Sequence, residues 1–181
     1  MKRPDVDLPR SFTIRESSYR IHNPFTSDKL ATLGQALSPT PGTRMLDLAC
    51  GTGEMLCTWA RDHQVTGTGI DIEPYWRREP PDQATVEGCD AIGSDDFLPL
   101  PELIERFGDL GCDVVEMVLA SQDSWDRYAA AQWLNIRRWL DANPGDELAG
   151  QMRAELATSP AQHARYRREY LGWGVFALMN R

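Results

Sequence analysis

Apolar and polar positions along the chain predict a short set of strands separated by helices. Compact apolar runs that are typical of buried strands occur at Met45–Leu48, Thr66–Ile72, Cys112–Ala120 and Gly172–Met179. Helical spacing of apolar residues covers about Ser27–Leu37, Glu54–Asp62, Pro101–Leu110, Ser124–Ala142, Glu147–Leu156 and Pro160–Tyr170. The first of these helices is expected to be capped by Ser27-Asp28 and the fourth by Ser124. Residues 1–18 are expected to form a loosely docked arm. The Pro-, Gly- and Asp-rich stretch 73–101 is expected to be mostly loop. The pattern predicts an α/β fold.

The segment Met45–Asp71 carries the most information about function. Its first strand runs into the turn Ala49-Cys50-Gly51-Thr52-Gly53, where Gly51 and Gly53 permit positive φ and a close approach of the backbone to a ligand. An amphipathic helix and a second strand follow. Asp71 then lies close to the offset of about 20 residues at which a βαβ unit presents an acid to a ribose hydroxyl. The segment therefore predicts a site for a nucleoside-bearing cofactor.

The spacing of the glycines narrows the choice of cofactor. A dinucleotide site uses G-x-G-x-x-G and a P-loop uses Gly-Lys-Ser/Thr, and neither pattern is present. Asp47 lies at the mouth of the turn, where a carboxylate would repel a pyrophosphate and attract a cationic group. A ligand that combines an α-amino group, a sulfonium and a ribose fits these features, and S-adenosyl-L-methionine (SAM) is such a ligand.

The sequence LDLACGTGE, followed by GTGIDI, resembles motif I and the next acidic motif of class I SAM-dependent methyltransferases. Ala49 stands where that family more often has glycine. The resemblance implies a Rossmann-like fold with SAM as cofactor, Asp71 on the ribose hydroxyls, and a methyl transfer to a small-molecule acceptor. The cofactor-binding residues that it implies are Asp47, Ala49, Cys50, Gly51, Gly53, Asp71 and Ile72.

The remaining resemblance comes in two blocks with an interruption between them. Arg20–Leu30 resembles the N-terminal cap of a bacterial subfamily, and Tyr75–Pro81 resembles the segment after its fifth strand. Val115–Tyr128 and Tyr170–Leu178 resemble its last two strands and the loop between them. Because Ile72 runs directly into Glu73, the resemblance implies that the third to fifth strands and their helices are missing.

The expected organisation is one methyltransferase-like domain. Residues 1–42 would form an N-terminal cap, 43–72 the SAM-binding βαβ unit, and 73–181 the C-terminal part with the last two strands and inserted helices. The sheet is expected to be incomplete, with a gap between the first two strands and the last two. A compact chain would have to close this gap by moving the strands together, or leave an edge open. Such an edge would favour a homodimer, because an open strand edge pairs readily with another chain.

Composition sets limits on partners and compartment. The net charge of −8 disfavours nucleic acid and anionic lipid as partners. The four cysteines contain no C-x-x-C pair, which argues against a zinc site or a disulfide scaffold and fits a reducing compartment. There is no apolar leader segment and no apolar run long enough to span a bilayer. We expect a cytoplasmic protein that uses no metal and acts on a small molecule.

The acceptor side of the site is less clearly defined by the sequence. Tyr75, Trp76 and Arg77 could hold an acidic or planar substrate, or could belong to a surface loop anchored by one tryptophan. Trp125 could contribute to a substrate lid, or to the core as part of an aromatic stripe. His22 and His63 have no partner at a spacing that suits a metal or a base. No catalytic base is assigned, because the segment in which the resemblance implies one is missing. The alternative function is a truncated, inactive relative that serves as a SAM-binding or interaction module.

Overall fold

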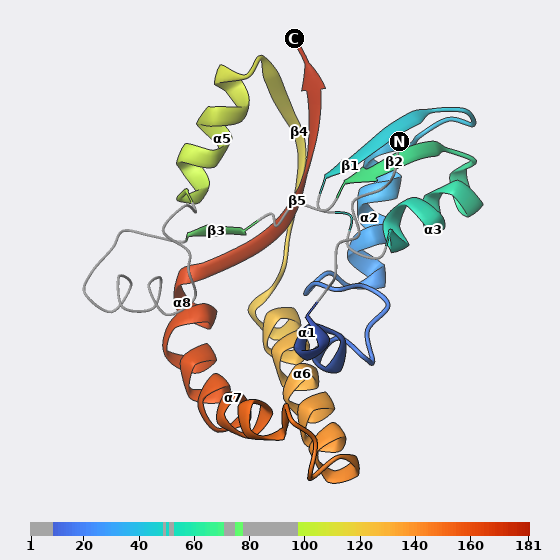
Figure 1. Ribbon diagram of the computed structural model, residues 1–181. Helices are drawn as coiled ribbons and strands as arrows, with labels where there is room; N and C mark the ends of the chain where they lie inside the picture. The colour runs from blue at the N-terminus through green and yellow to red at the C-terminus, as the bar shows by residue number, and fades with distance from the viewer. Residues whose placement is uncertain (1–8, 49, 51–52, 71–74, 78–97) are drawn as a thin grey trace.

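The computed structural model describes residues 9–48, 50, 53–70, 75–77 and 98–181 (Figure 1). Its helices are α1 (Arg10–Arg15), α2 (Ser27–Leu37), α3 (Glu54–His63), α5 (Leu100–Asp109), α6 (Gln122–Ala142), α7 (Ala149–Gln162), the π-helix η1 (His163–Arg167) and α8 (Arg168–Tyr170). Its strands are β1 (Arg44–Leu48), β2 (Thr66–Ile70), β3 (Tyr75–Arg77), β4 (Cys112–Leu119) and β5 (Leu171–Asn180).

The strands form two separate sheets. β1 and β2 pair in parallel, with Arg44 opposite Thr66. The second sheet has the order β3-β5-β4 and is antiparallel, with β3 pairing only along Leu171–Trp173 of β5. Within the described residues no strand joins the two sheets, and Figure 1 shows β1 and β2 lying to one side of the long β4–β5 pair. The predicted incomplete sheet with a gap is therefore confirmed. β3 was not predicted, because its region reads as loop.

The prediction that β1 and β2 are both buried is wrong. Leu46 of β1 is 60% exposed, and β2 is exposed from Thr66 to Gly69. Helix α3 covers one side of β2 through Leu56. Among the described strands β1 has a neighbour on one side only, so apolar residues that suit a central strand lie at the surface.

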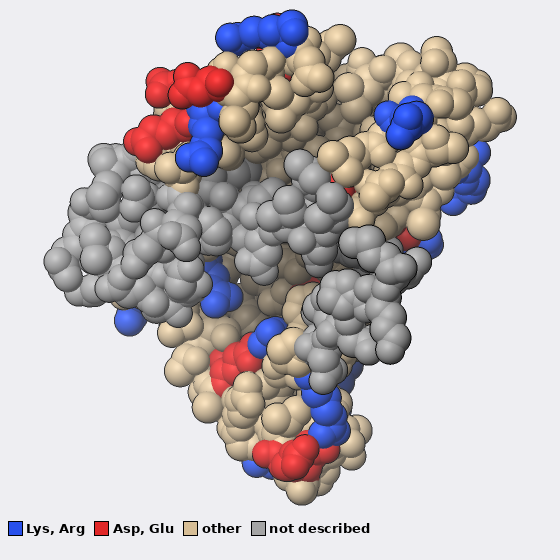
Figure 2. All heavy atoms as spheres, turned by 45° about the horizontal axis from the view of Figure 1, so that its top comes forward, with Lys and Arg blue, Asp and Glu red and all other residues tan. Residues whose placement is uncertain are grey.

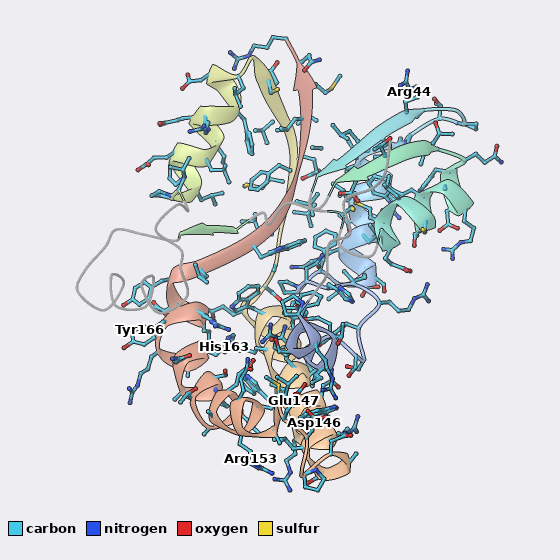
Figure 3. The ribbon with its side chains drawn as sticks, viewed as in Figure 1. Arg44, Asp146, Glu147, Arg153, His163 and Tyr166 are labelled. Carbon is cyan, nitrogen blue, oxygen red and sulfur yellow. The ribbon has the colours of Figure 1, made fainter. Side chains whose placement is uncertain are left out.

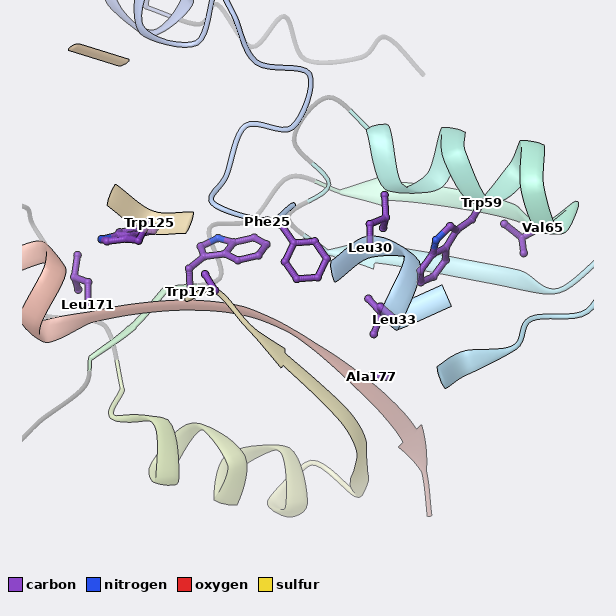
Figure 4. Close-up of a cluster of buried hydrophobic side chains, with 10 residues drawn as sticks. Phe25, Leu30, Leu33, Trp59, Val65, Trp125, Leu171, Trp173 and Ala177 are labelled. Carbon is purple, nitrogen blue, oxygen red and sulfur yellow. The ribbon is translucent and has the colours of Figure 1, made fainter. Parts of the chain in front are cut away.

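One buried cluster joins the two sheets through helices α2, α3 and α6 (Figure 4). Phe25 packs on Trp173 of β5 with ring centroids 5.4 Å apart, and Trp59 of α3 is almost completely buried. The cluster consists of Phe25, Leu30, Leu33, Trp59, Val65, Ala120, Trp125, Leu171, Trp173 and Ala177. The two sheets are thus connected by packed side chains, several of them large and aromatic, rather than by paired strands.

A second cluster belongs to the helices alone, and it corrects the expected loose arm at residues 1–18. It contains Ile14, Ile136, Leu140, Ala149 and Met152, from α1, α6 and α7. Residues 1–8 lie outside the described part, but α1 is firmly docked by polar contacts as well as by Ile14.

Three contacts hold the end of α1 against the helices. Arg15 forms an ion pair with Glu155 at 3.1 Å. The carboxylate of Glu16 accepts hydrogen bonds from Tyr128 Oη at 3.0 Å and from Gln132 Nε2 at 2.7 Å. The partners lie more than 100 residues away in the sequence, so local patterns could not reveal this docking.

Several predicted helix boundaries shift. The N-cap of α6 is Ser121 rather than Ser124, because Ser121 Oγ accepts the Ser124 N–H at 3.1 Å. Thr26 caps α2 in place of the predicted Ser27-Asp28. The two helices predicted on either side of Pro160 are continuous, since Pro160 lies inside α7. A proline removes one N–H and displaces one carbonyl, a loss that tertiary packing can outweigh.

On the face shown in Figure 2, acidic and basic side chains are interspersed. None of the helices in the described ranges is long and apolar enough to cross a bilayer. Within the same ranges no group of acidic, His and Cys side chains is arranged to hold a metal ion.

Candidate functional site

A cavity of about 910 Å³ lies between the two sheets. Its walls come from β1, β5, α2 and α5, and from the segment Ile21–Phe25 before α2. Most of the wall is apolar, with Phe25 and Trp173 among its large side chains. Asp47, Cys50 and Glu54 line the cavity where β1 leads into the turn before α3, and Ser38, Thr40, Thr43 and Arg44 line it at the start of β1. We call the end of the cavity at Asp47 and Cys50 its polar end.

Asp47 and Cys50 form this polar end. Asp47 precedes the last residue of β1, and its side chain is buried although it lines the cavity. The turn closes through a hydrogen bond from the Gly53 N–H to the Cys50 carbonyl at 2.8 Å. Gly53 has φ 78° as the N-cap of α3, so the predicted positive φ at this glycine is confirmed. A buried carboxylate beside a helix N-terminus can hold a cationic group.

The N-terminal cap segment closes this end of the cavity. Arg20 forms an ion pair with Glu54 at 2.7 Å, which ties the segment to the first turn of α3. His22 and Asn23 line the cavity, and Asn23 Oδ1 accepts the Phe25 N–H at 2.8 Å. The cap and the turn therefore form a single wall.

The other predicted site residues are distributed differently. Ala49, Gly51, Asp71 and Ile72 lie outside the described residues. The backbone of Tyr75, Trp76 and Arg77 forms β3, where Tyr75 is opposite Trp173. Trp125 does not line the cavity. It is buried in the cluster that includes Trp173 and Phe25, as the core interpretation of the aromatic stripe expected.

A polar cluster around the buried side chain of His163 was not predicted from the sequence. His163 Nε2 lies 2.8 Å from Asp126 Oδ1, and Arg168 Nε donates to Asp126 Oδ2 at 3.0 Å. The His163 ring meets Trp133 edge-on at 5.7 Å between centroids. His163 lies where α7 passes into α8 and faces α6 (Figure 3). Because His163 and Asp126 are 37 positions apart in the sequence, no local spacing could indicate this pair.

This cluster favours the ionised form of Asp126. Burial acts to raise the pKa of Asp126, but the hydrogen bonds from His163 and Arg168 outweigh it and lower the pKa below its ordinary value. The pair connects α6 to η1 and α8, the segment that leads into β5. Neither His163 nor Asp126 lines the cavity, so the cluster fixes the helices rather than the polar end of the site.

No family model matches the chain. The uncharacterized protein YjhP from Escherichia coli K12 is 42% identical, and the match covers 97% of this chain and 100% of the relative. That match spans 248 residues whereas this chain has 181, so at least 67 positions (248 − 181) of the relative have no counterpart here. The predicted loss of an internal segment is therefore supported by the relative's length.

Two solved structures are similar over almost the whole chain. A SAM-dependent methyltransferase from Geobacter sulfurreducens, in complex with S-adenosyl-L-homocysteine, is 44% identical with a TM-score of 0.85, and 97% of this chain and 99% of that chain are covered. The SAM-dependent methyltransferase from Thiobacillus denitrificans, in complex with the same ligand, is also 44% identical, with a TM-score of 0.84 and coverage of 97% and 100%. The chain belongs to the family of SAM-dependent methyltransferases.

Proposed function

We propose that this chain binds SAM at the polar end of the cavity and transfers its methyl group to a small-molecule acceptor. The observation that carries the proposal is the buried carboxylate of Asp47 beside the Cys50–Gly53 turn, at the carboxyl end of a parallel strand. Open α/β sheets bind ligands at that end of their strands. The two solved relatives in complex with S-adenosyl-L-homocysteine support the choice of ligand.

The chemistry of the described residues fits this cofactor. Asp47 would hold its α-amino group, and the turn at Cys50 and Gly53 would approach its methionine part. In the same proposal, Ala49 and Gly51 complete the turn while Asp71 and Ile72 bind the ribose. When bound, the cofactor supplies the reactive methyl group. The chain's own contribution is to orient the two reactants and to exclude water, for which the apolar walls of the cavity are suited.

The acceptor is proposed to contact the region of β3. Tyr75, Trp76 and Arg77 pair with the beginning of β5, next to Trp173 in the cavity wall. Trp125 would act from the layer behind this wall, since it packs in the same cluster as Trp173. The thiols of Cys57 and Cys112, which form no disulfide, fit a reducing compartment, and we propose the cytoplasm.

A second candidate function follows from the two unjoined sheets. A chain that lacks at least 67 positions of its relative could bind SAM without catalysing transfer, and could self-associate through the edge of β1. Labelled SAM, offered together with a small-molecule extract, separates the two functions. Label in an acceptor supports the enzyme, and SAM binding without transfer supports the module.

Calorimetry with S-adenosyl-L-homocysteine and with NAD, at equal concentrations, tests the cofactor assignment. We expect S-adenosyl-L-homocysteine to bind more tightly than NAD. Asp47→Asn should lower the affinity for S-adenosyl-L-homocysteine at least about tenfold, which is equivalent to about 1.4 kcal/mol. Asp113→Asn is the matched control, because Asp113 lies on β4 in an exposed ion pair with Arg181. Tighter NAD binding, or equal effects of the two variants, would contradict the assignment.

A further inference from the structure

His22 lies between the two parts of the cavity that the proposed function uses. On one side, the ion pair of Arg20 with Glu54 ties its segment to the first turn of α3, at the polar end. On the other side, Phe25 packs on Trp173 of β5 with ring centroids 5.4 Å apart (Figure 4). His22 comes between Arg20 and Phe25 in the sequence and lines the cavity. The segment therefore places His22 between the polar end and the aromatic wall at Trp173.

The ring of His22 is held by packing rather than by hydrogen bonds. It meets the ring of Phe12 edge-on, with centroids 5.6 Å apart and an interplanar angle of 74°. Phe12 belongs to α1, which packs on α6 and α7 through Ile14. Within the part of the chain that the structure describes, neither a hydrogen bond nor an ion pair involves this half-buried imidazole. The ring is thus oriented, while its two nitrogens stay available to a ligand in the cavity.

Asn23 supplies hydrogen-bond donors beside this imidazole. It also lines the cavity, and its Oδ1 accepts the Phe25 N–H at 2.8 Å, which fixes the orientation of the amide. The Nδ2 group carries two N–H donors, and no hydrogen bond from it to another described residue is formed. An imidazole and an amide on adjacent residues can hold one hydroxyl group, because the imidazole accepts its proton and the amide donates to its oxygen.

The cavity walls indicate which class of acceptor depends most on such a base. Phe25, Phe107, Trp173 and Phe176 line the cavity, and aromatic walls suit a planar ring. A phenol has an ordinary pKa of about 10, and apolar surroundings raise it further. A thiol, with an ordinary pKa of about 8.5, loses its proton more readily, and an amine would enter as a cation that apolar walls disfavour. A phenolic hydroxyl therefore gains most from an adjacent imidazole.

We propose that His22 is the catalytic base for methylation of a phenolic acceptor, an inference that rests on the proposed function. As the acceptor oxygen bonds to the methyl carbon, its O–H bond breaks and the proton passes to a ring nitrogen of His22. The electron pair of the O–H bond stays on the oxygen, and the pair of the methyl carbon–sulfur bond goes to the sulfur. The products are a methyl ether, S-adenosyl-L-homocysteine and an imidazolium, which returns its proton to water.

Binding of 4-nitrophenol to the full chain, without cofactor, tests the proton transfer directly, because the phenolate absorbs visible light far more strongly than the neutral phenol. At a pH below the pKa of this phenol in water, we expect binding to raise the phenolate fraction. His22→Gln keeps hydrogen-bonding groups but accepts no proton, so it should bind the phenol within about threefold of the parent chain without raising that fraction. His63→Gln is the matched control and should behave like the parent, because His63 also has an edge-on ring contact, with Trp59, but does not line the cavity.

Transfer of label from SAM to a panel of phenols of increasing ring number measures the catalytic consequence. His22→Gln should lower kcat by about 100-fold or more and leave the KM for SAM within about twofold. The proposal would be overturned if the parent chain did not ionise the bound phenol, if His22→Gln ionised it equally well, or if no phenol acquired label. Affinity for S-adenosyl-L-homocysteine, measured without phenol, reports separately on the proposed function. If that ligand failed to bind, the proposed function would be refuted, whereas a phenolate signal that depends on His22 would still identify the proton acceptor.

Discussion

Gly69 of β2 is the residue whose substitution tests most directly how the sheet supports the turn. A Cβ at this position would lie 2.6 Å from Cys50 Sγ and 2.9 Å from Cys50 Cβ. Contacts under 3 Å require movement, and Cys50 Cβ is attached directly to the backbone of the turn. Gly69→Ala should therefore displace the turn that leads from β1 into α3.

The size of the effect follows from the cost of overpacking. Inserting a methyl group into a tightly packed position costs about 1–3 kcal/mol of strain. In the unbound protein, displacement of the turn would relieve part of this strain. The ligand-bound state requires the turn in its original position, so ligand binding would restore the strain. A strain of about 1–3 kcal/mol would therefore reduce the affinity for the ligand by about 5- to 150-fold. Calorimetry with S-adenosyl-L-homocysteine measures this loss, and denaturant unfolding measures the accompanying change in stability.

Gly67 provides the matched control on the same strand. A Cβ there would lie 2.6 Å from Leu56 Cδ2, the end of a flexible side chain, and 3.1 Å from the Met45 carbonyl oxygen. Gly67→Ala should cost stability while leaving ligand affinity within about twofold, because it does not touch the turn. The double variant Gly69→Ala/Cys50→Gly should recover affinity relative to Gly69→Ala. If Gly69→Ala bound as tightly as the unsubstituted chain, the supposed link between β2 and the turn would be refuted.

Three further expectations can be checked with the same preparations. Asp71→Ala should weaken binding of S-adenosyl-L-homocysteine by about 1.5–3 kcal/mol and Asp90→Ala should not, by calorimetry; equal affinities would make Asp71 only a strand-end residue. The lowered pKa of Asp126 means that its contacts with His163 and Arg168 stabilise the fold above the ordinary aspartate pKa of about 3.9 and lose this effect as pH falls through the lowered value. Asp126→Asn should therefore lower the free energy of unfolding at pH 7 and flatten its decline in acid, in denaturant titrations; an unchanged acid profile would contradict this. Sedimentation should show the chain to be more associated than its longer relative, or thermal unfolding should show it to be less stable; a stable monomer with one sharp transition would count against both.

Local elements were predictable because their signals lie within a few residues. The run Met45–Leu48, the glycines of the following turn and the periodicity of Glu54–Asp62 each specify their own backbone. The structure gives β1, the positive φ at Gly53, and α3 in those places. The helix caps at Thr26 and Ser121 differ from prediction by one and three residues, because each neighbourhood offers more than one side chain able to accept a backbone N–H.

Long-range features were not predictable in the same way. The docking of α1 and the His163–Asp126 pair both depend on residues that the fold brings together from distant parts of the sequence. The exposure of Leu46 was not predicted for a different reason. Its apolar side chain suits a buried position, but no described residue covers it. For the candidate site, the sequence pointed to Asp47 and Cys50, which the structure places together in the cavity wall. His22 and Asn23 belong to the predicted N-terminal cap. Only the three-dimensional structure shows that they line the cavity.

The second cluster, built by Ile14, Ile136, Leu140, Ala149 and Met152, has a consequence for how the chain comes apart. Its members belong to α1, α6 and α7, and none comes from a strand. Such a unit can keep its amide hydrogens protected from exchange while the βαβ unit opens, so hydrogen exchange should resolve two cooperative units of different stability. The helical unit closes between α1 and the helices α6 and α7, and its packing therefore does not depend on how many strands the sheets contain.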